Sequence, residues 1–201
     1  MVRIILIILF LSNLYTYSFA AIGCSLNDPD RDVKRLFPDS TGYRTTFATL
    51  KEKGGEALQK QIEEKLGDKF DSAYESLDVP YAYYTILKGK EVIGYIHGVN
   101  QKGKYGGLQL ILTTDLKGKI LAFYYQKISS PESERFRGQA FTSQFTGLSL
   151  ADFSERVSKI ADPSKNNHED FKATLRGIKK NLILLDEFLK DKKQDNSNQQ
   201  N

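Results

Sequence analysis

The sequence predicts an α+β fold, in which amphipathic helices cover a largely antiparallel sheet of two hairpins. Between residues 81 and 128, short runs of β-branched and aromatic residues are separated by glycine-containing turns, as expected of strands joined by tight connections. A later segment, residues 171–189, repeats apolar residues at spacings of three and four, as in an amphipathic helix. Strands followed by such a helix favour an antiparallel sheet with helices on one face.

The two hairpins are placed by their turns. Gly89, within the turn 88–90, separates the first pair of strands, and Gly118, within the turn 115–118, separates the second pair. The predicted strands are 81–87, 91–99, 108–114 and 119–128.

Three segments carry helical patterns. In the first, residues 56–66, Leu58 and Ile62 lie four residues apart, and Gly67 follows as a helix cap. A second helix is expected over 132–145. The third is the most regular, with one apolar stripe. Its residues are Phe171, Leu175, Ile178, Leu182, Leu185 and Leu189.

The first 23 residues have the features of a secretory signal. Arg3 precedes a run of eight apolar residues at 4–11, and small residues follow before Cys24. A membrane-spanning helix would need about 20 predominantly apolar residues, and this run is too short and is followed by polar residues. We therefore predict that residues 1–23 are removed on export.

Cys24 is the predicted site of lipid attachment. It is the only cysteine in the sequence, and Ala21-Ile22-Gly23-Cys24 resembles a bacterial lipobox. Diacylglycerol on the sulfur and an acyl chain on the new amino group would supply the two chains that stable anchoring needs. The alternative is an ordinary signal followed by an unpaired cysteine. Because Ser25 follows, the usual sorting rule for lipoproteins of double-membraned bacteria indicates the outer membrane, with the domain in the periplasm or at the surface.

Cleavage before Cys24 leaves 178 of the 201 residues, a length that suits one domain with a substantial core. We expect a tether at 24–45, a folded domain at 46–190 and a disordered polar tail at 191–201. The mature chain holds 28 Lys and Arg against 25 Asp and Glu, and their signs alternate along the sequence. A nucleic-acid partner is not expected, because such proteins usually carry a stripe of one sign.

Few residues suit catalysis. Only two histidines, His97 and His168, are present, so a His and Cys metal cluster cannot be assembled. The sequence has no Gly-x-Ser-x-Gly nucleophile elbow. The pattern therefore favours a binding or electron-transfer module over an enzyme.

The glycine-rich segment at 103–107 has the most unusual backbone. Gly106 and Gly107 would let backbone amides approach a flat or anionic ligand, and Tyr105 could stack on a ring. The alternative is a flexible connection between the two hairpins, since glycine is common in turns.

The order of several short motifs resembles the FMN-binding domain family, which includes the flavin-carrying subunits of the sodium-pumping NADH:quinone oxidoreductase and of the Rnf complex. The similarity runs from about residue 81 to residue 185. The motifs are residues 91–95, 104–112 and 115–120, then Pro131-Glu132-Ser133, and finally Phe141-Thr142-Ser143-Gln144-Phe145-Thr146-Gly147.

That resemblance implies a flavin mononucleotide site, but this sequence departs from the family at the attachment motif. The family joins the flavin phosphate to a threonine just before the last helix, and here His168 stands near that position without the Gly-Ala that precedes the threonine. Covalent flavin is therefore not expected. Noncovalent FMN would place Tyr105, Gly106 and Gly107 beside the ring and Lys165 and His168 near the phosphate, at the positive end of the last helix. Glu132 lies in the segment that resembles the family's glutamate-containing loop.

Three functions are consistent with these residues. The first is a membrane-anchored flavin carrier that passes electrons between extracytoplasmic redox partners, with the cofactor supplying the chemistry. The second is a flavin-free interaction or assembly lipoprotein that retains the fold, which the missing threonine favours. The third is a lipoprotein that binds another small molecule. Fold similarity alone does not separate them.

Overall fold

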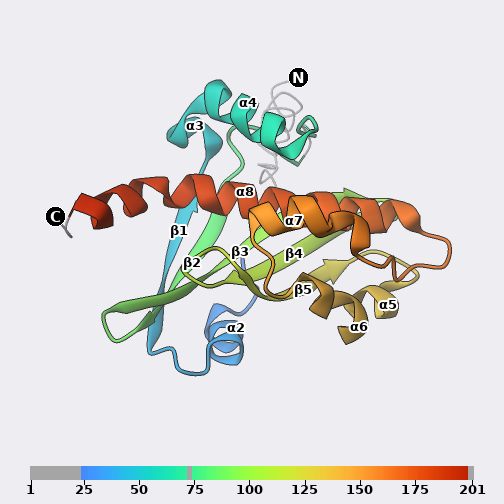
Figure 1. The fold of residues 1–201 in the computed structure, drawn as a ribbon, viewed down its shortest axis with the longest axis horizontal. Coiled ribbons are helices and arrows are strands. Elements are labelled where there is room, and N and C mark those ends of the chain that lie inside the picture. The colour runs from blue at the N-terminus through green and yellow to red at the C-terminus, as the bar shows by residue number, and fades with distance from the viewer. Residues whose placement is uncertain (1–23, 72–73, 199–201) are drawn as a thin grey trace, which may run out of the picture.

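The computed structural model describes residues 24–71 and 74–198, so the predicted signal segment 1–23 lies outside the described residues. The centre of the fold is a five-stranded antiparallel sheet whose strand order follows the chain. Helix α8 lies across this sheet (Figure 1). The α+β class and the antiparallel sheet are confirmed. The strands are β1 (Gly42–Ala48), β2 (Tyr81–Lys88), β3 (Glu91–Gly103), β4 (Gly106–Thr114) and β5 (Ile120–Ile128).

Both predicted hairpins are present, and the structure adds a third. β3 extends to Gly103 and pairs in register with β4 until Gly103 faces Gly106, so the segment predicted as a ligand loop is a tight turn. β1 adds a fifth strand at the edge of the sheet, paired with β2. It was not predicted, because most of its side chains are exposed or half-buried and carry no alternating apolar pattern.

The amino-terminal segment is folded rather than a free tether. Asp28 caps α2 (Pro29–Leu36) by accepting a hydrogen bond from the Arg31 amide, and Val33 of that helix is buried. Two further short helices, α3 (Leu50–Lys53) and α4 (Gly55–Leu66), follow β1. The predicted helix over 56–66 corresponds to α4, and Gly67 caps it in the left-handed conformation.

The segment predicted as one helix over 132–145 is broken in two. α5 (Ser133–Arg137) ends at Gly138, whose extended ψ of 140° interrupts the helical hydrogen bonds. α6 (Gln139–Thr142) and the 3-10 turn η1 (Ser143–Phe145) continue the chain and bury Phe141 and Phe145. Further on lie α7 (Leu150–Arg156), the 3-10 turn η2 (Val157–Lys159) and α8 (His168–Asn198).

α8 is the long amphipathic helix predicted from the apolar stripe. It continues through 191–198, where a disordered tail was expected, because that stretch contains no proline or glycine to end a helix. Within the part of the chain that the structure describes, no helix is long and apolar enough to cross a membrane.

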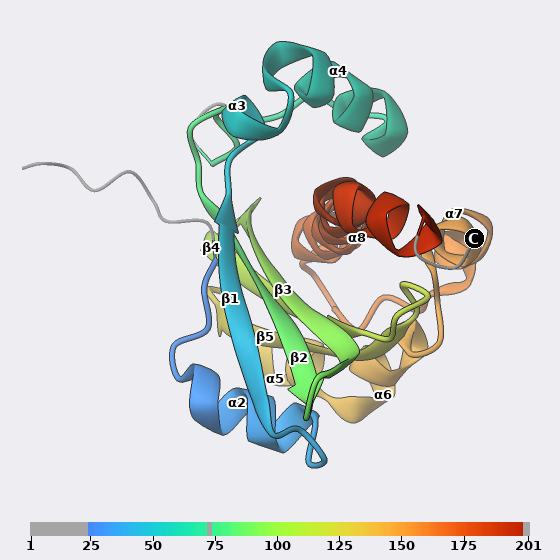
Figure 2. The ribbon, with the colours of Figure 1, turned by 90° about the vertical axis from the view of Figure 1, so that its left-hand side faces the viewer.

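The sheet has a core on each face, and Figure 2 shows α8 on one side of the sheet and α2 on the other. On one face, β2, β3, β4 and β5 pack against α4, α7 and α8 around residues such as Leu112 and Ile183. On the other face, Cys24, Leu26 and residues of α2 cover a smaller cluster that contains Ile96 and Ile111. The amino terminus of the described chain is therefore part of the second core.

α8 is fixed on the sheet by buried charges. The Glu75 carboxylate accepts hydrogen bonds from Lys180 Nζ and from Arg176 at 2.8 and 3.1 Å. Arg176 also donates to Gln101 Oε1 at 2.9 Å, and Lys180 donates to the Asn100 carbonyl at 2.7 Å. Arg176 and Lys180 thus join α8 directly to β3, and Glu75 holds both cations from the loop before β2.

Glu75→Gln should lower the free energy of unfolding by about 3 kcal/mol, because removing one partner leaves buried cations without their counter-charge. Glu75 is 1% exposed, so solvent does not compensate. Urea unfolding followed by far-UV circular dichroism measures the difference. Glu155→Gln on α7 is the control, since Glu155 is exposed and such surface changes stay within about 0.5 kcal/mol. Equal stabilities of the two variants would contradict the role given to Glu75.

Candidate functional site

Three segments meet at the start of α8, two of which overlap motifs of the family resemblance, while the third is where the family carries its attachment threonine. They are the β3–β4 turn, residues 129–132 and residues 162–170, which we call together the helix-start site. The Lys104 amide donates to Asp170 Oδ1 at 2.7 Å, and Asn167 Nδ2 donates to Ser130 Oγ at 3.1 Å. Residues 66 and 37 positions apart in the sequence are thus brought into contact.

The Glu132 carboxylate is hydrogen-bonded to backbone amides in the loop where a phosphate was predicted. Its carboxylate accepts hydrogen bonds from the amides of Lys165 at 2.9 Å and Asn166 at 3.2 Å. Such an arrangement satisfies two amides just before α8 with a negative charge of the chain itself. Two of the amides near the predicted phosphate position are therefore already bonded to a carboxylate of the chain.

Two other carboxylates make the helix-start site acidic. Asp170 is fully buried and accepts from both the Lys104 amide and Asn167. Asp162 accepts from His168 Nδ1 at 2.6 Å. Burial acts to raise the pKa of Asp162, but hydrogen bonds from His168 and Ser164 outweigh it and hold the pKa below its ordinary value. His168 is therefore engaged with a carboxylate within the chain.

The glycine-rich segment is shaped by the turn. Tyr105 is 52% exposed, and Lys104 Nζ lies 5.8 Å from the centre of its ring. Gly106 has φ of +133°, and a Cβ there would lie 3.1 Å from Ser129 Cβ, so the turn itself requires glycine. Gly107, by contrast, has open space where a Cβ would stand. The geometry of the turn thus explains why residue 106 is glycine, and it leaves Tyr105 on the surface.

His97 is a core residue. Its Nδ1 lies 2.8 Å from Asn181 Oδ1, while Asn181 Nδ2 donates to the His97 carbonyl at 3.0 Å. Nδ1 therefore carries the proton, and Nε2 is a buried acceptor with no partner among the described residues. Burial lowers the pKa of His97 to about 4.

Cys24 lies against the sheet. It is 2% exposed, and a Cβ placed on Gly98 would be 3.0 Å from its sulfur and 2.5 Å from its carbonyl oxygen. Burial raises the pKa of the thiol to about 12. The next residues are held as well, since the Leu26 amide donates to the Tyr84 hydroxyl at 3.0 Å. In this conformation the thiol is shielded from reagents.

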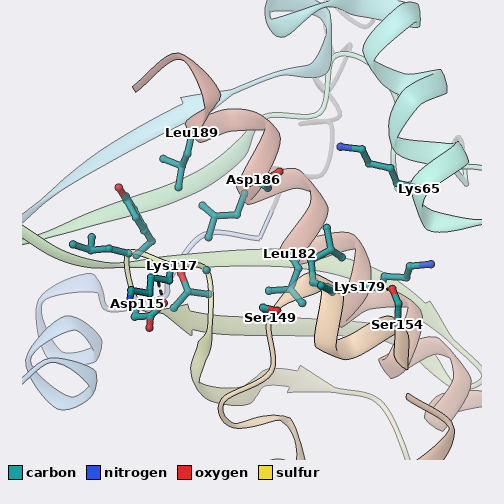
Figure 3. A pocket seen from close by; sticks show the side chains of 16 residues that line it. Lys65, Asp115, Lys117, Ser149, Ser154, Lys179, Leu182, Asp186 and Leu189 are labelled. Atoms are coloured by element: carbon teal, nitrogen blue, oxygen red, sulfur yellow. Dashed lines mark hydrogen bonds between the residues drawn. The ribbon is translucent and has the colours of Figure 1, made fainter. Parts of the chain in front are cut away.

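Sequence reasoning missed a cleft between α8, α7, α4 and the β4–β5 turn, which we call the α8 cleft. It has a volume of about 520 Å³, within the range of small-molecule sites. Figure 3 shows Leu189 of α8 above the turn that carries Asp115 and Lys117, and Leu182 of the same helix to one side of this turn. The leucines were assigned to the core from their periodicity, and no sequence signal separates a core leucine from one that lines a cleft.

Other chemistry is not assembled in the described part of the chain. No group of three or more His, Cys, Asp or Glu residues there could hold a metal ion. A scan against protein-family models and a search of curated proteins both give no match. The resemblance to the FMN-binding family therefore stays a prediction from the quoted motifs.

The buried His97 predicts an acid-sensitive fold. Because its folded pKa of about 4 lies below the unfolded value of 6.5, the unfolded chain binds the proton first, and stability falls as the pH drops through this window. The contribution at pH 5 is about 2 kcal/mol. His97→Gln should be less stable at pH 7.5 but lose about 2 kcal/mol less than wild type between pH 7.5 and pH 5, measured by urea unfolding. Parallel pH profiles for the two proteins would show that His97 does not titrate in this way.

Proposed function

We propose that this chain is a membrane-anchored extracytoplasmic lipoprotein whose FMN-binding-like domain works as a flavin-free binding or assembly module. One observation carries the proposal: the Glu132 carboxylate holds the amides of Lys165 and Asn166, where a flavin phosphate would be expected. A phosphate would have to displace a carboxylate that belongs to the same fold.

The charges of the helix-start site do not fit a phosphate group. Glu132, Asp162 and Asp170 all accept hydrogen bonds there, and Asp170 is fully buried. Lys104 lies 3.6 Å from Glu169, so this nearby cation already has a counter-charge. Like charges within a few ångströms repel, and burial strengthens the effect because water screens less. With His168 in place of the attachment threonine, neither a covalent bond nor a strong ionic site is provided.

A second candidate is a noncovalent FMN carrier with redox partners. It is favoured by the contacts that join the β3–β4 turn and Glu132 to residues 162–170, the stretch where the family carries its attachment threonine. Binding would require Glu132 to leave the two amides, with Tyr105 available on the surface for stacking.

The membrane anchor has its own structural requirement. A diacylglycerol on Cys24 Sγ does not fit where Cys24 is 2% exposed and its sulfur is packed at Gly98. In the lipid-bearing protein, the first residues must therefore turn away from the sheet. Outer-membrane placement, in the periplasm or at the surface, follows from Ser25 and remains part of the proposal.

The flavin question can be tested on residues 24–201 produced without the signal segment, which keeps Cys24 in its core. FMN and riboflavin are titrated in parallel, and quenching of flavin fluorescence reports binding. We expect no quenching with either compound at micromolar protein. Glu132→Ala, which frees the two amides, and Glu134→Ala, on the exposed part of α5, are measured as a matched pair.

Each outcome separates the candidates. Saturable binding of FMN but not of riboflavin by the wild-type protein would establish the second candidate and overturn the first. Binding of FMN gained only in Glu132→Ala would show that the carboxylate blocks an otherwise competent site, in agreement with the flavin-free proposal.

A further inference from the structure

The α8 cleft contains a buried polar group with nothing to bond. Thr114, at the end of β4, is 1% exposed, and its hydroxyl oxygen has no hydrogen-bond partner among the described residues. It pairs across the sheet with Tyr95, and both residues line the cleft. Because an unsatisfied buried hydroxyl is costly, such a group directly beside a cleft is a candidate partner for a ligand that enters the cleft.

Leucines form the apolar part of the cleft wall. Leu150 of α7 and three leucines of α8 line it, and the α8 leucines are about 95% buried. At its mouth, Leu116 of the β4–β5 turn is 51% exposed, which is unusual for a leucine in an otherwise polar turn. The α8 leucines are Leu182, Leu185 and Leu189. A ligand here would have an elongated apolar body.

The lysines that line the cleft differ in whether their ammonium groups have a partner within the chain. Lys65 pairs with Glu187 at 2.5 Å, and Lys179 donates to the Leu66 carbonyl at 3.0 Å. Lys117 makes no ion pair among the described residues. It lies in the same turn as Leu116 and three residues after Thr114. Figure 3 places Lys117 on the turn side of the cleft, below Leu189.

The acids of the cleft are already engaged. Asp115 Oδ1 accepts from the amides of Lys117 at 2.9 Å and Lys119 at 2.8 Å, which shapes the turn and offsets part of its charge. Asp186 on α8 also has a partner. Near the turn, the Thr114 hydroxyl and the Lys117 ammonium are therefore the groups left to meet a carboxylate, and the charge of Lys117 has to outweigh that of Asp115.

We propose that the α8 cleft binds a fatty acid, with its carboxylate between Thr114 and Lys117 and its chain along the leucines of α8 and α7. The cleft is separate from the helix-start site, because Leu182 follows His168 by 14 residues, or about 21 Å along α8. The inference therefore goes beyond the proposed function and does not depend on whether flavin binds.

The probe is 11-(dansylamino)undecanoic acid, added to residues 24–201, with dansyl fluorescence as the readout. We expect saturable binding with one site per chain. Dodecanoate should displace the probe, and dodecanol should do so at about tenfold higher concentration, because it lacks the charge that Lys117 would meet. Absence of saturable binding, or equal displacement by the alcohol, would overturn the proposal.

Variants locate the site. Leu116→Glu and Lys117→Glu at the exposed mouth should each weaken probe binding about tenfold or more. Leu121→Glu is the matched control, because Leu121 is an exposed leucine, 45% accessible, that does not line the cleft. Equal weakening by all three substitutions would point to adsorption on the surface and overturn the assignment.

Thr114→Val separates a loss of ligand contact from a loss of folding, because its stability and its affinity are measured independently. It removes an unpaired hydroxyl while keeping the shape, so the thermal midpoint should stay unchanged or rise. Affinity for the probe should nevertheless fall about tenfold. A stable variant with unchanged affinity would show that Thr114 does not contact the ligand.

Discussion

The position of α8 depends on one buried carboxylate. Glu75 bonds both Lys180 and Arg176, and these two cations also bond acceptors of β3. Burial acts to raise the pKa of Glu75, but Arg176 and Lys180 outweigh it, so the group stays ionised and its pKa lies below the ordinary value. A buried ion pair often adds little net stability, but its geometry fixes how two elements meet.

That fixed position determines both candidate sites. With α8 held on β3, its first residues meet the β3–β4 turn through Asp170 and Lys104, and its later leucines form one wall of the α8 cleft. A close contact in between supports this alignment, because a Cβ on Gly177 would lie 2.1 Å from Leu110 Cδ1. A shift of α8 along the sheet would therefore change the two sites together.

The periodicity of the sequence predicted the elements whose formation depends on residues close together in the chain. It did not predict the strand and the side-chain bonds that depend on contacts between distant residues. The hairpins and α8 follow from local patterns, whereas β1 is stabilised by pairing with β2 and has little apolar signal of its own. Glu132 was expected at the site only from the family resemblance, because its bonds go to residues more than 30 positions away. The unpaired hydroxyl of Thr114 has no sequence signature, since only the fold determines whether a threonine finds a partner.

Cys24 sets the order of events in the proposed lipoprotein. A thiol reacts as its thiolate, and burial against Gly98 raises the pKa of Cys24 to about 12, so the folded protein would offer almost none of the reactive form. Lipid attachment must therefore precede the packing of this segment on the sheet. Once the lipid is attached, the sulfur no longer fits beside Gly98, and the apolar surface of Ile96 and Ile111 loses part of its cover. The membrane-proximal face would then be the face that carries α2.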